Sequence, residues 1–135
     1  MLQLNVIRPE EARQMNPLQL AYMGDVIWST IIRTRYVCRK LNVHHLHQIT
    51  VSLVNASAQA QALDSIRQML TEEENDLVRR GRNAHARHPA PKNQDPAKYA
   101  DSTAFETLFG FLYITGNLQR IDELTEVILE DVNDA

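Results

Sequence analysis

The chain has little of what several protein classes need. Among its 135 residues there is one cysteine, Cys38, so no internal disulfide can form, which is typical of a protein of the reducing cytoplasm. No apolar run of about 18 residues is present to span a membrane. The segment 1–20 contains acids and lacks the continuous apolar stretch of a signal peptide. We therefore expect a cytoplasmic protein without a membrane segment, in which Cys38 packs rather than acts as a nucleophile.

Other absences exclude particular chemistries. The four glycines are scattered, so there is no glycine-rich phosphate loop, and a zinc centre built on paired cysteines is impossible. The histidines form two small groups, one of His44, His45 and His47 and one of His85 and His88. Neither group supplies enough convergent ligands to favour a transition-metal site.

What the sequence does contain is enough apolar material for one core. With 44% hydrophobic residues, the chain suits a single domain covering 1–135. The net charge of −3 hides an uneven distribution, because residues 79–98 include six basic residues and one acid. A basic segment on an otherwise acidic chain favours a polyanion-binding site, although a solvated charged loop has the same composition.

Apolar residues recur at helical spacing along the chain, and no alternating strand pattern is present. Asn16 followed by Pro17 predicts a helix that begins there and runs to about Arg35. The segment 43–70 is interpreted as one short and one longer helix. The fold class is therefore all-α, with five to seven helices.

The second half of the chain has clear start and stop signals. Thr71-Glu72-Glu73-Glu74 is a capping box that opens a helix continuing toward the arginines. Prolines at 89, 91 and 96 interrupt regular helix, so the next helix is expected to be capped by Asp101 or Ser102. Gly116 should end that helix, and a last one should cover 118–131. The aromatic side chains, Tyr22 and Trp28 among them, are assigned to packing rather than to base stacking.

Two carboxylates break the amphipathic pattern. Asp25 follows Gly24 within an apolar stretch, and Glu106 lies in an equally apolar stretch that ends at Gly110. Both acids are expected to be buried, and a buried carboxylate needs a partner, a metal ion or a raised pKa. Each glycine costs about 1 kcal/mol in a helix interior, a cost usually retained for close helix packing or ligand access.

If the two helices cross at these glycines, the two acids meet. Like charges repel unless a cation lies between them, and a hard cation such as Mg²⁺ fits a site with few carboxylates and several waters. The alternative is that each acid bonds to a nearby arginine or to a helix end. A Mg²⁺ site beside an excess of basic residues favours phosphodiester hydrolysis.

Three blocks of sequence follow one another around these acids: Leu20-Ala21-Tyr22-Met23-Gly24-Asp25-Val26-Ile27, then Arg80-Gly81-Arg82-Asn83-Ala84 with Pro91-Lys92-Asn93, then Ser102-Thr103-Ala104-Phe105-Glu106-Thr107-Leu108-Phe109-Gly110-Phe111-Leu112-Tyr113. The first and last blocks resemble the two motifs of the ribonuclease III family. The middle block resembles the pattern of its short branch, Mini-ribonuclease III, which lacks a separate double-stranded RNA-binding domain. The resemblance covers about residues 16–130.

The chain departs from full-length members of that family at three positions. They carry further acids three residues before the second-motif glutamate, and four and seven residues before the first-motif aspartate. Thr103, Ala21 and Leu18 occupy those positions here. The short branch shows the same reduction, so the departure implies a weaker second metal rather than inactivity. Asp101 is a substitute candidate, but its place on the helix turns it away from Glu106.

The resemblance implies a homodimer of ribonuclease III endonuclease domains with a valley for duplex RNA between the subunits. Each subunit would cut one strand in a Mg²⁺-dependent reaction that leaves a 5′-phosphate. Asp25 would bind the metal and position the attacking water, and Glu106 would be a second ligand. Backbone contacts are expected from five residues of the basic segment: Arg80, Arg82, Asn83, Lys92 and Asn93.

The same resemblance implies that the substrate is precursor 23S ribosomal RNA, with a ribosomal protein aiding its selection. Two alternatives stay open at this point. One is a non-catalytic double-stranded RNA-binding or ribosome-assembly factor, and the other is a helical protein adaptor whose acidic C-terminal stretch is the contact surface.

Overall fold

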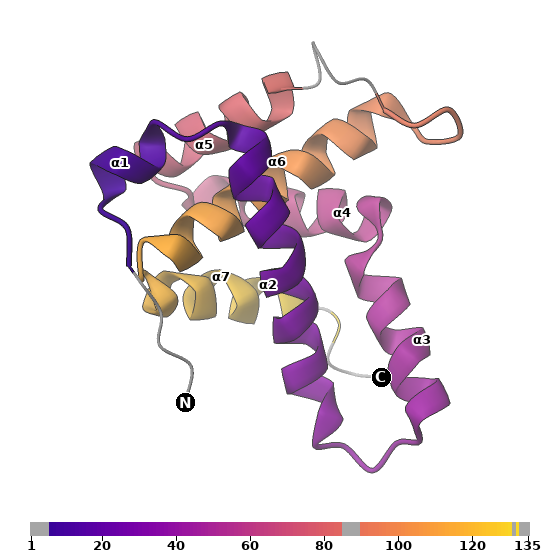
Figure 1. The fold of residues 1–135 in the computed structure, drawn as a ribbon. Helices are drawn as coiled ribbons and strands as arrows, with labels where there is room; N and C mark the ends of the chain where they lie inside the picture. The colour runs from indigo at the N-terminus through magenta and orange to yellow at the C-terminus, as the bar shows by residue number, and fades with distance from the viewer. Residues whose placement is uncertain (1–5, 85–89, 131, 133–135) are drawn as a thin grey trace.

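The computed structural model describes residues 6–84, 90–130 and 132, and every regular element in these ranges is helical (Figure 1). The elements are α1 (Pro9–Arg13), α2 (Pro17–Val37), α3 (Val43–Val54), α4 (Ala56–Ile66), the short 3₁₀ helix η1 (Arg67–Met69), α5 (Glu72–Asn83), α6 (Pro96–Ile114) and α7 (Leu118–Glu130). The all-α prediction and the expected range of five to seven helices are confirmed. None of the described helices is both long and apolar enough to cross a membrane.

The two capping signals read from the sequence are present. The Asn16 side chain accepts a hydrogen bond from the backbone N–H of Leu18, and the Gln19 side chain accepts one from the N–H of Asn16. Thr71 and Glu74 exchange the equivalent pair of bonds at the start of α5. Each pair satisfies N–H groups that a helix start leaves without intrahelical partners.

The predicted start of α6 was wrong. The helix begins at Pro96 rather than near Ser102, with Asp95 as its cap accepting a bond from the Ala97 N–H at 2.9 Å. Proline is favoured at the first helical position because its N–H would be unpaired there anyway, so Pro96 opens the helix instead of interrupting it. The end was right, since Gly116 follows α6 with a φ of +79°.

Three smaller differences concern α1, α3 and α7. The sequence did not predict α1, whose five residues begin at Pro9. Helices α3 and α4 have 12 and 11 residues, rather than one short and one longer span. Helix α7 is described to Glu130, and residue 131 lies outside the described residues.

Helix α6 is the centre of the fold, and α1, α2, α4, α5 and α7 all pack against it. Trp28 of α2 meets Phe105 and Phe109 of α6 edge-on, at ring-centroid distances of 5.0 and 5.5 Å. The indole N–H of Trp28 donates to the carbonyl of Leu53, which ties the end of α3 to α2. Trp28 is thus a packing residue as predicted, and its one polar atom is satisfied.

The crossing of α2 and α6 leaves no room for side chains at its two glycines. A Cβ on Gly24 would lie 1.8 Å from the carbonyl oxygen of Glu106, and one on Gly110 would lie 1.8 Å from that of Leu20. The predicted crossing at these glycines is therefore confirmed. It brings the backbones of the two acid-bearing helices into direct contact.

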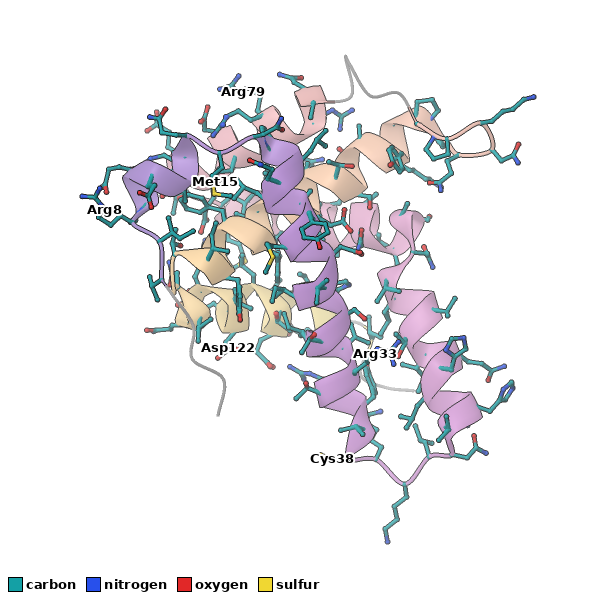
Figure 2. The ribbon with its side chains drawn as sticks, viewed as in Figure 1. Arg8, Met15, Arg33, Cys38, Arg79 and Asp122 are labelled. Carbon is teal, nitrogen blue, oxygen red and sulfur yellow. The ribbon has the colours of Figure 1, made fainter. Side chains whose placement is uncertain are left out.

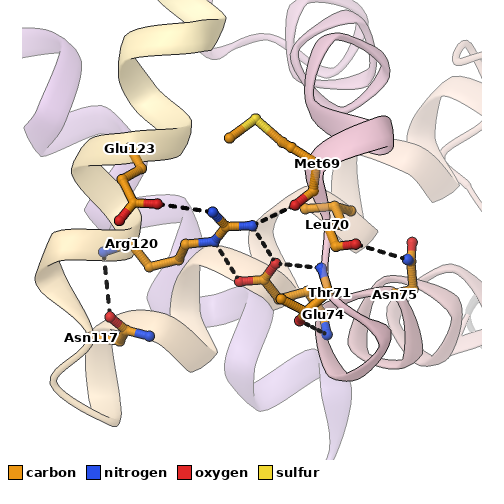
Figure 3. Close-up of polar contacts among 8 residues, drawn as sticks. All are labelled: Met69, Leu70, Thr71, Glu74, Asn75, Asn117, Arg120 and Glu123. Carbon is orange, nitrogen blue, oxygen red and sulfur yellow. Dashed lines mark hydrogen bonds and ion pairs between the residues drawn. The ribbon is translucent and has the colours of Figure 1, made fainter.

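A polar cluster around Arg120 ties α7 to the start of α5 (Figure 3). The guanidinium donates to both carboxylate oxygens of Glu74 at 2.8 Å and to the carbonyl of Met69 at 2.7 Å. Burial would raise the pKa of Glu74, but the bonds from Arg120 and Thr71 outweigh it and hold that pKa below its ordinary value. This carboxylate is buried, charged and fully partnered.

Candidate active site

A groove of about 430 Å³ opens between α2, α4 and α6, and Asp25 and Glu106 both line it. We call it the acidic groove. Asp25 comes from the third turn of α2, next to Gly24, and Glu106 comes from the middle of α6, one turn before Gly110. Because the helices touch at their glycines, the acid beside each crossing point reaches the same space.

The two carboxyl groups act on each other directly. The pKa of Glu106 is raised to about 8 by burial, then by a hydrogen bond to Asp25 and by the charge of Asp25, while Gln59 opposes the rise. No basic group contributes to that shift among the described residues. The alternative in which Glu106 is bonded to an arginine is therefore wrong, and the predicted meeting of the two acids is confirmed.

The expected burial of both acids was only half right. Glu106 is half-buried, but Asp25 is exposed. Its neighbours Tyr22 and Val26, which made the stretch look like core, are themselves 75% and 54% exposed. The packing role assigned to Tyr22 was thus wrong within this chain. One face of α2 carries apolar side chains that no described residue of the same chain covers.

The three positions at which full-length members of the family carry further acids lie in the same groove. Leu18, Ala21 and Thr103 all line it, beside Asp25 and Glu106. Within the described ranges no three His, Cys, Asp or Glu side chains gather to hold a metal ion. The groove therefore offers two carboxylates, and any cation there would keep most of its water.

Asp101 does not add a third carboxylate. It forms ion pairs with Arg82 and with Arg67, the latter at 3.3 Å, so two cations already neutralise it. The prediction that Asp101 turns away from Glu106 is confirmed, since Asp101 is absent from the residues lining the groove.

The predicted RNA contacts lie on α5 and on the turn before α6, outside the lining of the acidic groove. Asn83, Lys92 and Asn93 are exposed. Arg82 is paired with Asp101, and Arg80 donates to the carbonyl of Met15 at 3.1 Å. Both arginines thus have structural contacts that the sequence did not predict.

Of the two histidine groups, His44, His45 and His47 are exposed on α3, whereas His85 and His88 fall outside the described residues. Cys38 is exposed at the end of α2 (Figure 2), so the expectation that it packs was wrong.

One residue of the groove was missed. Gln59 of α4 is 1% exposed, lines the acidic groove and acts on Glu106. Its place in the sequence held a signal, because Gln59 lies at helical spacing between Ala56 and Leu63 on the apolar face of α4. A polar side chain on such a face needs a partner when buried.

Comparison with known proteins identifies the class first. The family model of the ribonuclease III domain matches residues 18–117, which include both acids and both glycines of the crossing. The crystal structure of protein FN1578 from Fusobacterium nucleatum has the same fold, with a TM-score of 0.80 and 26% identity over 88% of this chain and 95% of that one.

Sequence relatives define the branch. Mini-ribonuclease 3 of Symbiobacterium thermophilum is 46% identical over 111 residues, covering 82% of this chain and 85% of the relative. Mini-ribonuclease 3 of Staphylococcus aureus is 39% identical over 123 residues, covering 89% and 91%. The chain belongs to the ribonuclease III family, in its Mini-ribonuclease 3 branch, and is therefore an endoribonuclease.

Proposed function

We propose that this endoribonuclease cleaves double-stranded RNA in a Mg²⁺-dependent reaction at Asp25 and Glu106. The observation that carries the proposal is the meeting of these two carboxyl groups in one groove, with the pKa of Glu106 raised to about 8. A carboxyl pair of this kind is costly to the fold, and perturbed pairs in clefts mark functional sites. A divalent cation would remove the repulsion.

The donor set fits magnesium. Two carboxylates and no nitrogen or sulfur ligand line the groove among the described residues, and oxygen ligands with several retained waters are what Mg²⁺ prefers. Asp25 and Glu106 would hold the ion. When bound, it supplies positive charge to the reacting phosphate and makes a water molecule nucleophilic.

Asp25 and Glu106 have different proposed roles because they differ in exposure. Asp25 is the exposed acid, so it is placed to orient the attacking water. Glu106 is half-buried against α4 and is the better anchor. At neutral pH its raised pKa means that a cation competes with a proton for this carboxyl group.

The exposed apolar face of α2 supports a homodimer. Tyr22 and Val26 are one turn apart and flank Asp25 on the same helix. Large apolar side chains next to a catalytic groove are explained if a second subunit covers them, since such patches usually mark interfaces. A two-fold contact there would set two acidic grooves side by side, one for each strand of a duplex.

RNA binding is assigned to the basic segment. Lys92, Asn93 and Asn83 are exposed and available to the backbone of a duplex, which proteins recognise mainly by shape. Arg82 would exchange Asp101 for a phosphate, and Arg80 retains further N–H donors beyond its bond to Met15. The proposed substrate is precursor 23S ribosomal RNA in the cytoplasm, with a ribosomal protein aiding selection. The resemblance to the short branch supports this choice.

A long RNA duplex incubated with the protein, with Mg²⁺ or with a chelator, tests the proposal. Cleavage in Mg²⁺ and none in chelator is expected, and Asp25→Asn should bind the duplex without cutting it. Asp122→Asn, which changes an exposed acid of α7, is the control and should cut normally. A wild-type protein that shifts the duplex but cuts it in no divalent metal would instead be a non-catalytic binding factor.

A further inference from the structure

Gln59 is a buried polar side chain that no step proposed above uses. It lies on α4 with 1% of its surface exposed, at the border of the acidic groove. Its amide oxygen accepts a hydrogen bond from the hydroxyl of Ser102, which is itself 6% exposed and belongs to α6. Two buried polar groups from different helices are thus joined next to Glu106.

In the structure the amide oxygen of Gln59 faces Ser102, whose hydroxyl donates to it. An amide has an acceptor on one side and two N–H donors on the other. Gln59 lowers the pKa of Glu106, as an N–H donor does, which assigns the amide nitrogen to the side of Glu106 while the oxygen takes the bond from Ser102. The reverse orientation would turn the amide oxygen toward a carboxylate, which is repulsive.

The amide nitrogen of Gln59 is buried, and no complete hydrogen bond satisfies it among the described residues. Buried donors in proteins nearly always have a partner, so one without a partner requires an explanation. The carboxylate of Glu106 has two oxygens. It can therefore accept from Gln59 with one oxygen and leave the other for a cation.

We propose that Gln59 is a positioning residue that aims the carboxylate of Glu106 toward Asp25 and so prepares the acidic groove for a divalent cation. This rests on the function proposed above. The groove has Leu18, Ala21 and Thr103 where further acids would otherwise share the cation. With only two ligands, the affinity for the cation depends on how well each carboxylate is oriented. Ser102 and Gln59 supply that orientation for Glu106 without binding the cation themselves.

Mn²⁺ binding to the RNA-free protein, measured by electron paramagnetic resonance, tests this role separately from cleavage. Gln59→Leu removes the amide at nearly constant volume and should weaken Mn²⁺ binding about tenfold, as loss of an outer partner commonly does. Gln61→Leu is the matched control, because Gln61 is exposed on the same helix, and it should bind as wild type does. A residue that only packs would change the melting temperature and leave Mn²⁺ affinity unaltered.

Ser102→Ala is the second variant and decides the question if Gln59→Leu does not fold. It keeps Gln59 but releases the amide from its fixed orientation, so a several-fold loss of Mn²⁺ affinity is expected. Wild-type affinity in a folded Gln59→Leu protein, or in Ser102→Ala where the first variant does not fold, would overturn the positioning role. A wild-type protein that binds no Mn²⁺ would overturn it as well.

The two proposals fail in different ways. If Gln59→Leu weakens Mn²⁺ binding but the wild-type protein cuts no duplex RNA, the positioning role stands and the proposed function falls. If the wild-type protein cuts the duplex and Gln59→Leu binds Mn²⁺ normally, the function stands and the positioning role falls.

Discussion

Glu74 is buried and Glu106 is half-buried in the same fold, and the pKa values of the two glutamates are shifted in opposite directions. Burial acts on both in the same direction, because it disfavours the charged form. Glu74 faces Arg120 and the cap of α5, and its pKa is lowered. Glu106 faces another acid, and its pKa is raised to about 8. The neighbouring groups, rather than the extent of burial, therefore decide which carboxylate supports the structure and which is left to bind a cation.

The comparison also separates stability from activity. The Arg120 cluster joins α5, η1 and α7 through hydrogen bonds to Glu74 and to the carbonyl of Met69 (Figure 3). The acidic groove is left with an unfavourable pair. Sites that function often cost the fold stability, and the stability is recovered elsewhere.

Glu106→Gln should have the largest effect, and only on activity. Loss of a ligand should lower cleavage of duplex RNA about a thousandfold or more, since a metal contributes several kcal/mol to the transition state and each 1.36 kcal/mol is about tenfold in rate. The thermal midpoint measured in chelator should stay the same or rise, because the repulsion from Asp25 is gone. A variant that unfolds at lower temperature would contradict the view that this pair is a cost to the fold.

Arg120→Met should have the reverse pattern. Removing one partner of a buried pair leaves Glu74 charged and unpaired, so we expect a loss of about 3 kcal/mol in the free energy of unfolding. Urea unfolding at neutral pH measures it. Cleavage by the protein that remains folded at low temperature should be close to normal. The double variant Arg120→Met with Glu74→Leu should recover part of the lost stability, and failure to do so would count against an unpaired charge as the cause.

The pH dependence of stability should have opposite signs at the two glutamates. The pKa of Glu106 is raised from 4.5 to about 8, so the folded protein binds this proton more tightly and its stabilising effect is lost as pH rises through that window. The lowered pKa of Glu74 gives stability that is lost as pH falls below about its ordinary value of 4.5. In urea unfolding measured with chelator, the wild-type protein should lose stability as pH rises from 4.5 to about 8, and Glu106→Gln should not show this loss. An unchanged slope in that variant would refute the assignment.

Lys92→Ala should have the smallest effect. Loss of one phosphate contact should weaken duplex binding by up to about tenfold at low salt and reduce the salt slope by about one. Filter binding across a salt series measures both quantities. Lys40→Ala, an exposed lysine after α2, is the control and should bind as wild type does. Equal losses in the two variants would indicate general charge attraction rather than a contact of the basic segment.

Local signals in the sequence predicted what depends on neighbouring residues. The cap at Asn16 and the capping box at Thr71 are made within one helical turn, and both are present. The meeting of Asp25 and Glu106 was also predictable, because a glycine beside each acid marks the place where two helices can touch.

Features that depend on distant residues were not predictable. The pairing of Arg82 with Asp101, and of Arg120 with Glu74, joins residues 19 and 46 positions apart, and no periodicity specifies such partners. The exposure of Asp25 was missed for a different reason. Helical spacing marks an apolar face but does not tell whether the same chain or another molecule covers it.

The contact between Gly24 and Gly110 has a consequence for the accuracy of the site. Most distances between helices are set by interlocking side chains, which rotate and adjust when the core is repacked. Here main chain rests on main chain, and a peptide unit has no rotamers to exchange. The spacing of the two acids therefore depends little on how the surrounding side chains pack. A single methyl group added at either glycine would push the two helices, and with them the two acids, apart.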